Sequence, residues 1–238
     1  MNRKGRFGFI YAHPDDETFL SACVIRGLAD LGESPVLLLA TRGEAGRNRT
    51  ERATNKEELA ALREQEMAAV SGILGISQVD YLGWPDGQLG AIDFHKLVDG
   101  VILFIQRNEL RVIFTFPEDG GNGHPDHVAI SKATTAAVLS GKCPTVRKLY
   151  YAASGSLRSA GYSPSIAVDT EAGWSVKAAA LRAHASQHVA IANYFGDLDV
   201  FPVERRFEAF VLGWRDGTMW PQEAQTTLLE LFTTDEIY

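Results

Sequence analysis

Cysteine is nearly absent from this sequence. Only Cys23 and Cys143 occur among 238 residues, and they form no CxxC or zinc-finger pattern. This spacing argues against a disulfide framework and against a cysteine-bound zinc site. We therefore expect two reduced thiols in a cytoplasmic protein.

Long hydrophobic runs and an excess of positive charge are also missing. The N-terminal stretch MNRKGRFGFIYAHPDDE has too short an apolar part for a signal peptide, and no run approaches the length of a membrane span. The formal net charge is -7. Nucleic acid or an anionic membrane would require a basic surface, so we expect no nucleic-acid partner and no membrane insertion.

The glycine patterns of nucleotide-binding loops do not occur. No GxGxxG follows the first expected strand, and no GxxxxGK[ST] is present. These absences disfavour nicotinamide and nucleotide chemistry.

What the chain does contain is an alternation of short apolar runs with longer helical patterns. The expected strands are 7–12, 35–41, 79–83, 112–116, 149–153, 166–169 and 207–214. The expected helices are 16–31, 56–74, 93–107, 126–140 and 172–187. The alternation predicts an α/β fold with a mostly parallel sheet and helices on both faces. The pattern loosens past residue 150, so we expect one domain, 1–238, with a C-terminal extension.

Two His-Pro-Asp motifs stand where an expected strand gives way to a helix, AHPDDE at 12–17 and GHPDH at 123–127. Ligands of parallel α/β sheets bind at this edge. Proline favours the first helical position, which predicts Pro14 and Pro125 there, with His13 and His124 as N-caps.

The spacing within these motifs predicts a metal site. His13 and Asp16 are three residues apart and share a helix face, whereas Asp15 is turned away by about 100°. The second motif would bring either His124 or His127 to the same point. Two histidines, one carboxylate and an open position form a recognised catalytic zinc arrangement. Asp15 would then be a general base, and the remaining histidine would stabilise an oxyanion or donate a proton.

A purely structural explanation exists for each motif taken alone, because acids at a helix N-terminus complement the helix dipole. Two such motifs at the ligand-binding edge of one sheet favour a functional site over two acidic caps.

At these residues the sequence resembles the LmbE-like, or PIG-L, family of zinc-dependent N-acetylglucosaminyl deacetylases, whose signature motifs are AHPDDE and GHPDH. Further matching segments are TRGEAG (41–46), ALREQEMAAVSGILGI (61–76), LGWPDGQL (82–89) and KAAALRAHASQ (177–187). The resemblance implies a Rossmann-like fold.

The resemblance also implies a ligand set and a reaction. Zn²⁺ would be held by His13, Asp16 and His127, although Fe²⁺ or another divalent metal would accept the same donors. Asp15 would be the general base, and His124 would stabilise the oxyanion or donate a proton. A water activated at the metal would attack an acetamide carbonyl and release acetate and a free amine.

Four further residues follow from the resemblance, each with a plainer alternative. Arg63 would contact substrate, or else pair with Glu66 on a helix surface. Asp86 and Glu44 would bind sugar hydroxyls, or else serve as a turn residue and a loop acid. His184 would pack beside the site.

The substrate would be a small N-acetylated sugar conjugate whose aglycone the sequence does not identify. Arg47, Arg49 and Arg52 in the loop at 42–55 are either solvated or recognise an anionic aglycone. The sequence leaves the oligomeric state open and is compatible with a homo-oligomer.

Two rival functions use the same residues. A non-haem Fe(II) oxygenase also uses two histidines and a carboxylate. A non-catalytic sugar-binding protein could retain the metal for structure alone. An acid in the position of a general base favours hydrolysis over both.

Overall fold

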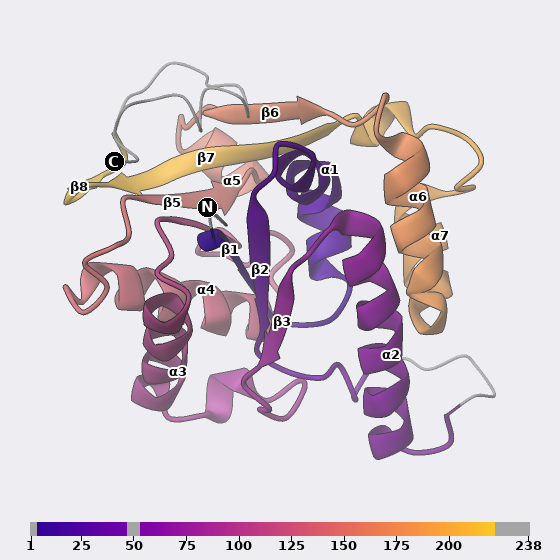
Figure 1. Cartoon of the computed structure of the whole chain (residues 1–238), viewed down its shortest axis with the longest axis horizontal. Helices are drawn as coiled ribbons and strands as arrows, with labels where there is room; N and C mark the ends of the chain where they lie inside the picture. Colours follow the sequence, from indigo (N-terminus) through magenta and orange to yellow (C-terminus); the bar gives the residue numbers. More distant parts are fainter. Residues whose placement is uncertain (1–3, 47–52, 222–238) are drawn as a thin grey trace.

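The computed structural model describes residues 4–46 and 53–221. One sheet runs through the molecule in the order β3-β2-β1-β4-β5-β7-β6, with β8 paired to β7 (Figure 1). Its strands are β1 (Lys4–Tyr11), β2 (Ser34–Leu39), β3 (Gln78–Tyr81), β4 (Val112–Thr115), β5 (Lys148–Ala152), β6 (Ile166–Asp169), β7 (Phe207–Arg215) and β8 (Thr218–Met219). The pairings among β1 to β5 are parallel, which confirms the predicted mostly parallel sheet.

Helices cover both faces of this sheet. They are α1 (Asp16–Asp30), α2 (Lys56–Leu74), α3 (Phe94–Arg107), α4 (Pro125–Leu139), α5 (Gly155–Ser159), α6 (Trp174–Ala183) and α7 (His188–Phe195). Short 3₁₀ turns are η1 (Leu89–Ala91), η2 (Ala185–Gln187) and η3 (Val203–Arg205). Figure 1 shows α1, α2 and α6 on one side of the sheet, with α3 and α4 on the other. No described helix is both long enough and apolar enough to cross a membrane.

The expected C-terminal extension adds to the central sheet. β7 pairs antiparallel with both β5 and β6. Phe9, Phe114, Tyr150 and Phe210, one from each of β1, β4, β5 and β7, form a contiguous row of rings in the core. Such ring pairs add about 0.5–1.5 kcal/mol each beyond the area they bury. The extension is therefore joined to the first half of the chain by shared core packing.

Two helix predictions need correction. The segment expected as one helix at 172–187 is α6 followed by η2, because His184 between them leaves helical geometry with ψ 52°. The cap expected for the first motif was also wrong, although the expected start of the helix at residue 16 is correct. That helix begins at Asp16, and Asp15 precedes it with φ 119° and ψ -30°, so Pro14 is not its first residue. In α4 the prediction is confirmed, with Pro125 first and His124 as N-cap.

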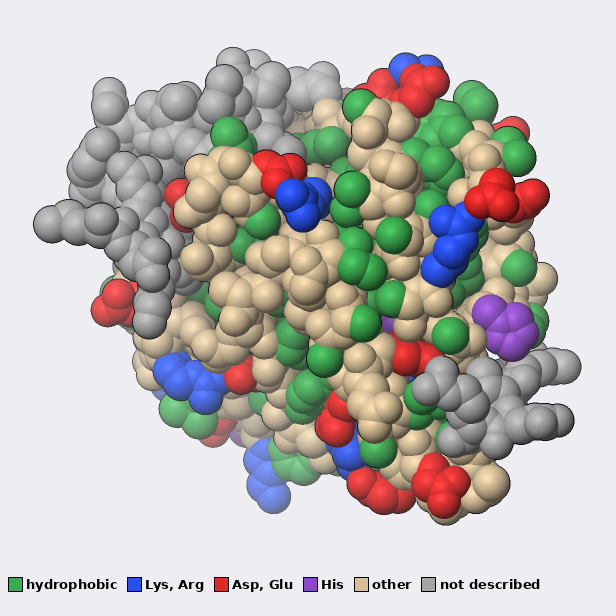
Figure 2. Space-filling view, turned by 45° about the vertical axis from the view of Figure 1, so that its right-hand side comes forward, with side chains coloured by type: hydrophobic (Ala, Val, Ile, Leu, Met, Phe, Trp, Pro, Cys, Tyr) green, Lys and Arg blue, Asp and Glu red, His purple; other side chains and the backbone are tan. Residues whose placement is uncertain are grey.

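The surface agrees with the acidic composition. On the face shown in Figure 2, Lys and Arg side chains of the described residues lie next to acidic ones and form no continuous basic patch. Ion pairs of this kind in the described part of the chain include Arg42 with Glu64 and Arg206 with Asp169, wherever on the surface they lie.

Candidate active site

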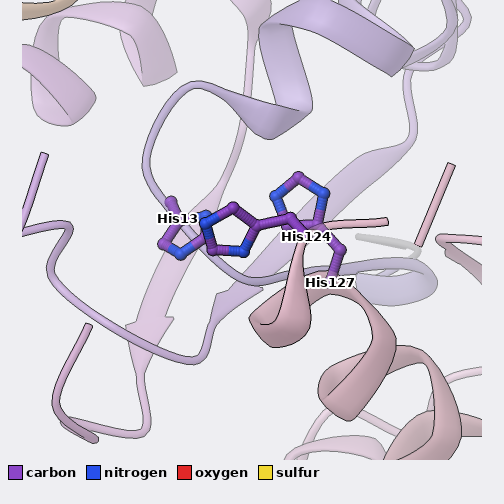
Figure 3. A group of neighbouring side chains, drawn as sticks. All are labelled: His13, His124 and His127. Atoms are coloured by element: carbon purple, nitrogen blue, oxygen red, sulfur yellow. The ribbon is translucent and has the colours of Figure 1, made fainter. Parts of the chain in front are cut away.

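The two His-Pro-Asp motifs meet at the carboxyl end of neighbouring strands. β1 pairs with β4, so the turn into α1 lies beside the turn into α4. Figure 3 shows His13 from the first turn facing His124 and His127 from the second. The ring centroids of the three imidazoles lie 4.7–5.2 Å apart. The topology thus produces the convergence that the spacing predicted.

Asp16 completes this cluster. Its Oδ2 lies 3.5 Å from His13 Nδ1, and its Oδ1 lies 3.3 Å from His127 Nε2. The backbone N–H of His13 also donates to Oδ2 at 2.8 Å. His13 and Asp16 converge as expected, but through the turn before α1 and not along a shared helix face.

The outward nitrogens of the two histidines have partners that fix the rings. His13 Nε2 lies 3.1 Å from Asp86 Oδ1 and 3.3 Å from Asp126 Oδ2. His127 Nδ1 lies 3.2 Å from the Gly120 carbonyl, which can only accept a hydrogen bond, so Nδ1 carries the proton. His13 Nδ1 and His127 Nε2 are left facing Asp16. This is the pattern of metal-binding imidazoles, whose second nitrogen bonds to a carboxylate or carbonyl.

Among the residues that the structure describes, two groups of side chains could hold a cation. The nitrogens of His13, His124 and His127 lie within 4.8 Å of one another, as do ligand atoms of His13, Asp86 and Asp126. In the second group, Asp126 already accepts the backbone N–H groups of Gly87 and Leu89. The carboxylates of that group therefore support His13, which leaves the inner face, next to Asp16, as a place where a cation could be held.

The charges around the cluster suit a cation. Burial alone would raise the pKa of Asp16, but the imidazoles of His127 and His13 outweigh it and hold that pKa well below its usual range. Burial alone would lower the pKa of His13, and hydrogen bonds to three carboxylates outweigh it and raise that pKa well above its usual value. Ionised oxygen beside imidazole nitrogen is a donor set that zinc accepts.

Asp15 stands beside the cluster in an unusual backbone conformation. Its φ of 119° lies in a region that favours glycine, and holding a residue there costs about 1–3 kcal/mol. Burial raises the pKa of its carboxyl to about 6, although the Arg63 charge opposes the shift. A strained, half-buried acid next to a cluster of metal-binding groups is the arrangement expected of a general base.

Arg63 on α2 binds the Asp15 side chain and two neighbouring backbone carbonyls. The side chain is 2% exposed, and its Nη2 donates to the Asp15 carboxylate at 3.1 Å and to the Pro14 carbonyl. Its Nη1 donates to the Gly43 carbonyl at 2.8 Å. The predicted contact between Arg63 and substrate stays a prediction, since the described donors point to Asp15 and the backbone.

Glu44 and Asp86 join two loops of the site. Glu44 Oε1 accepts the backbone N–H of Asp86, and Asp86 Oδ2 accepts that of Ala45, both at 2.8 Å. Glu44 Oε2 is buried and has no hydrogen-bond partner among the described residues. Binding of sugar hydroxyls by these two acids stays a prediction. Arg47, Arg49 and Arg52 lie outside the described residues.

His184 is fully buried against the start of α1. Its Nε2 lies 2.8 Å from Glu17 Oε1. Burial alone would lower the pKa of His184, but the charge and hydrogen bond of Glu17 outweigh it and raise that pKa. His184 was predicted to pack beside the site. In the structure it bonds to Glu17, and Glu17 in turn bonds to the backbone of Asp15.

Sequence reasoning missed Asp126, Gly120 and Glu17. Asp126 lies inside the second motif, but its partners are in the 82–89 segment and in the first motif. Glu17 is the last residue of AHPDDE, and the signal for it was that it is a third consecutive acid to which no role had been given. The carbonyl of Gly120 carries no side-chain signal at all.

A model of the PIG-L family, described as GlcNAc-PI de-N-acetylase, matches residues 9–138. A 1D-myo-inositol 2-acetamido-2-deoxy-alpha-D-glucopyranoside deacetylase of Mycolicibacterium vanbaalenii is 30% identical over 229 residues, covering 76% of this chain and 80% of the relative. A probable N-acetyl-alpha-D-glucosaminyl L-malate deacetylase 2 of Bacillus cereus is 33% identical over 131 residues, covering 54% of this chain and 59% of the relative. For the Bacillus relative and three further curated deacetylases, the match spans only 46–59% of the relative's own length.

Solved structures share the fold. The N,N'-diacetylchitobiose deacetylase of Pyrococcus horikoshii superposes with a TM-score of 0.68 at 18% identity, covering 88% of this chain and 84% of the other. A 4-carboxy-2-hydroxymuconate hydratase of Pseudomonas putida also reaches 0.68, at 15% identity, covering 93% and 99%. Because a hydratase and a deacetylase share this architecture, the fold alone does not fix the reaction. The family match and the long alignment to the Mycolicibacterium relative nevertheless show that this chain belongs to the PIG-L, or LmbE-like, family.

Proposed function

We propose that this chain is a zinc-dependent N-deacetylase that hydrolyses the acetamide of a small N-acetylglucosamine-type conjugate. The observation that carries the proposal is the convergence of His13, Asp16 and His127 beside Asp15 in its strained backbone conformation. The names of the curated relatives, which are deacetylases of such sugars, support the substrate class.

His13 Nδ1, the Asp16 carboxylate and His127 Nε2 would hold the metal. When bound, it would act as a Lewis acid and bring the pKa of water towards neutrality. Asp15 takes a proton from the attacking water, and Arg63 keeps its carboxylate in place. The new C–O bond forms at the acetamide carbon, and the C–N bond then breaks.

We assign His124 to the oxyanion that develops on the acetamide oxygen. Its Nδ1 accepts the backbone N–H of Asp126 at 3.2 Å, so the proton of the neutral ring is on Nε2. Nε2–H can donate a hydrogen bond to the developing oxyanion. The proton that Asp15 took from the water then passes to the nitrogen of the leaving amine. The products are acetate and a free amine.

A substrate screen tests the proposal. The zinc-loaded protein would be incubated with N-acetylglucosamine and with its inositol, malate and oligosaccharide conjugates, and acetate and amine would both be measured. Metal content would be determined on the same sample, with Asp15→Asn as the inactive control. A zinc-loaded protein that releases acetate from none of them contradicts the proposal.

Zinc should leave the protein as the pH falls. The two imidazoles must be neutral to bind metal, so protons compete with it below a pH of about 6.5. The carboxylates around His13 raise the pKa of that ring, so competition begins at a higher pH than for a free imidazole. Equilibrium dialysis between pH 7.5 and 4 would measure the loss, and zinc retained at about pH 4 would contradict histidine ligands.

Gly120→Ala should weaken metal binding. Gly120 has φ 73°, and a Cβ there would lie 2.8 Å from the Cβ of His127. Displacing His127 and its carbonyl partner should lower zinc affinity by about 10–100-fold, as loss of groups that orient a ligand does. Competition with a chromogenic chelator would measure the affinity.

Gly123→Ala is the matched control. Gly123 lies in the same loop with φ 78°, and no described atom lies within 4 Å of its would-be Cβ. Alanine at position 123 therefore has a similar free-energy cost of positive φ but does not contact His127. Equal zinc affinity in the two variants would show that Gly120 does not position His127.

A further inference from the structure

A buried acid and a buried histidine lie directly behind the reactive turn, and the proposed chemistry uses neither. Glu17 and His184 are both 0% exposed, and His184 Nε2 lies 2.8 Å from Glu17 Oε1. The Thr18 hydroxyl donates to the same oxygen at 2.6 Å. The carboxylate is therefore fixed by two neighbours, one of them from the far end of α6.

The second oxygen of Glu17 reaches the peptide of Asp15. Glu17 Oε2 accepts the backbone N–H of Asp15 at 3.0 Å. This N–H belongs to the residue with φ 119° that α1 uses as its N-cap. A residue that precedes the first turn of a helix has no helical partner for its N–H. Here the Glu17 carboxylate accepts that N–H instead.

Asp15 is thus held at both ends. Arg63 fixes its side chain and the preceding carbonyl, and Glu17 fixes its N–H. His184 touches neither Asp15 nor the proposed metal ligands in any hydrogen bond of the described residues. Its hydrogen-bonded route to the reaction passes through Glu17 and its neighbour Thr18, and its charge also acts directly on the Asp15 carboxyl.

His184 also has a buried polar atom that lowers the stability of the fold and that packing alone does not explain. Its Nδ1 is buried without a hydrogen-bond partner among the described residues. A buried polar atom without a partner destabilises a fold, and such atoms are expected where a residue serves a site. An apolar side chain would fill the same space without that cost.

We propose that Glu17 and His184 are positioning residues, which hold the backbone of Asp15 in the left-handed conformation that aims its carboxylate at the substrate. The proposal rests on the proposed role of Asp15 as base. His184 acts at a distance by fixing the orientation of the Glu17 carboxylate.

Three variants test this in the zinc-loaded full chain. His184→Ala removes the donor to Glu17 and should lower kcat by about 10- to 100-fold, as a misplaced catalytic group does, with KM and bound zinc unchanged. His184→Gln places an amide donor near the position of Nε2 and should restore most of that loss. Lys177→Met is the control, because Lys177 forms the other buried ion pair between α6 and its neighbours, with Glu208 at 2.7 Å. It should lower the melting temperature without lowering kcat.

Three results would overturn the proposal: an unchanged kcat in His184→Ala, a His184→Gln protein as slow as His184→Ala, or an equal loss of kcat in Lys177→Met. If His184→Ala does not fold, the nearly isosteric Thr18→Val removes the other donor to Glu17. An unchanged kcat in that variant would count against positioning, and a lowered kcat at constant KM would support it.

Crystal structures separate this proposal from the proposed function. Asp15 should leave the region near φ 119° in His184→Ala and keep it in His184→Gln and Lys177→Met. If the wild-type protein deacetylates nothing, the proposed function fails, yet an unmoved Asp15 in His184→Ala would still overturn the positioning role, and a moved one would support it.

Discussion

Asp15→Ala should retain its zinc and lose nearly all turnover. General bases contribute about 10²- to 10⁴-fold to rate. Asp15 lies beside the proposed ligands and, unlike Asp86 and Asp126, is not bonded to His13. We expect kcat to fall by that factor while zinc content stays at the wild-type level. Acetate release and metal analysis on the same preparation measure both quantities.

Asp15→Asn sharpens the test. Asparagine tolerates positive φ better than alanine and can keep a contact to Arg63 through its oxygen, but it cannot take up a proton. It should therefore be as slow as Asp15→Ala and closer to wild type in stability. Substantial turnover in a purified Asp15→Ala protein would remove Asp15 from the role of base.

His13→Ala should lose the metal itself. His13 joins the inner face of the cluster, through Nδ1, to the supporting carboxylates Asp86 and Asp126, through Nε2. Removing only an orienting group costs about 10–100-fold in metal affinity, so removing the ligand should cost at least about 100-fold. Dialysed protein should contain little zinc and should release no acetate at ordinary zinc concentrations.

His95→Ala is the companion control for His13→Ala. His95 lies exposed at the start of α3, and its loss changes the histidine count without reaching the site. It should bind zinc as the wild type does. A His13→Ala protein that retains stoichiometric zinc would exclude His13 from the metal site.

Much of the architecture could be predicted, because periodicity is a local property. The run PVLLLA at 35–40 is apolar throughout, as a strand buried on both faces requires, and most of it lies in β2. The place of β7 could not be predicted in the same way. Its pattern indicates a strand, but its antiparallel position between β5 and β6 depends on pairing across the whole fold.

The start of α1 illustrates where local rules fail. Proline after a histidine predicts the same cap in both motifs, and at Pro125 it is correct. At Pro14 the rule is wrong because Arg63 and Glu17 bind the neighbouring backbone and hold Asp15 outside helical geometry. Arg63 comes from α2, and His184, which bonds to Glu17, lies past the end of α6, so both are at sequence separations that no local pattern records. The exception falls at the residue proposed to do the chemistry, where strain is expected.

The partners of Asp126 carry a consequence for protein design. Its carboxylate bonds at once to His13 of the first motif and to the N–H groups of Gly87 and Leu89, while Asp126 itself belongs to the second motif. Grafting only the two His-Pro-Asp turns onto another parallel sheet would leave this carboxylate without the N–H groups of Gly87 and Leu89, and His13 Nε2 without Asp86. A transplanted centre would need the 84–89 turn as a third insert, so the smallest portable unit spans three loops of the sheet.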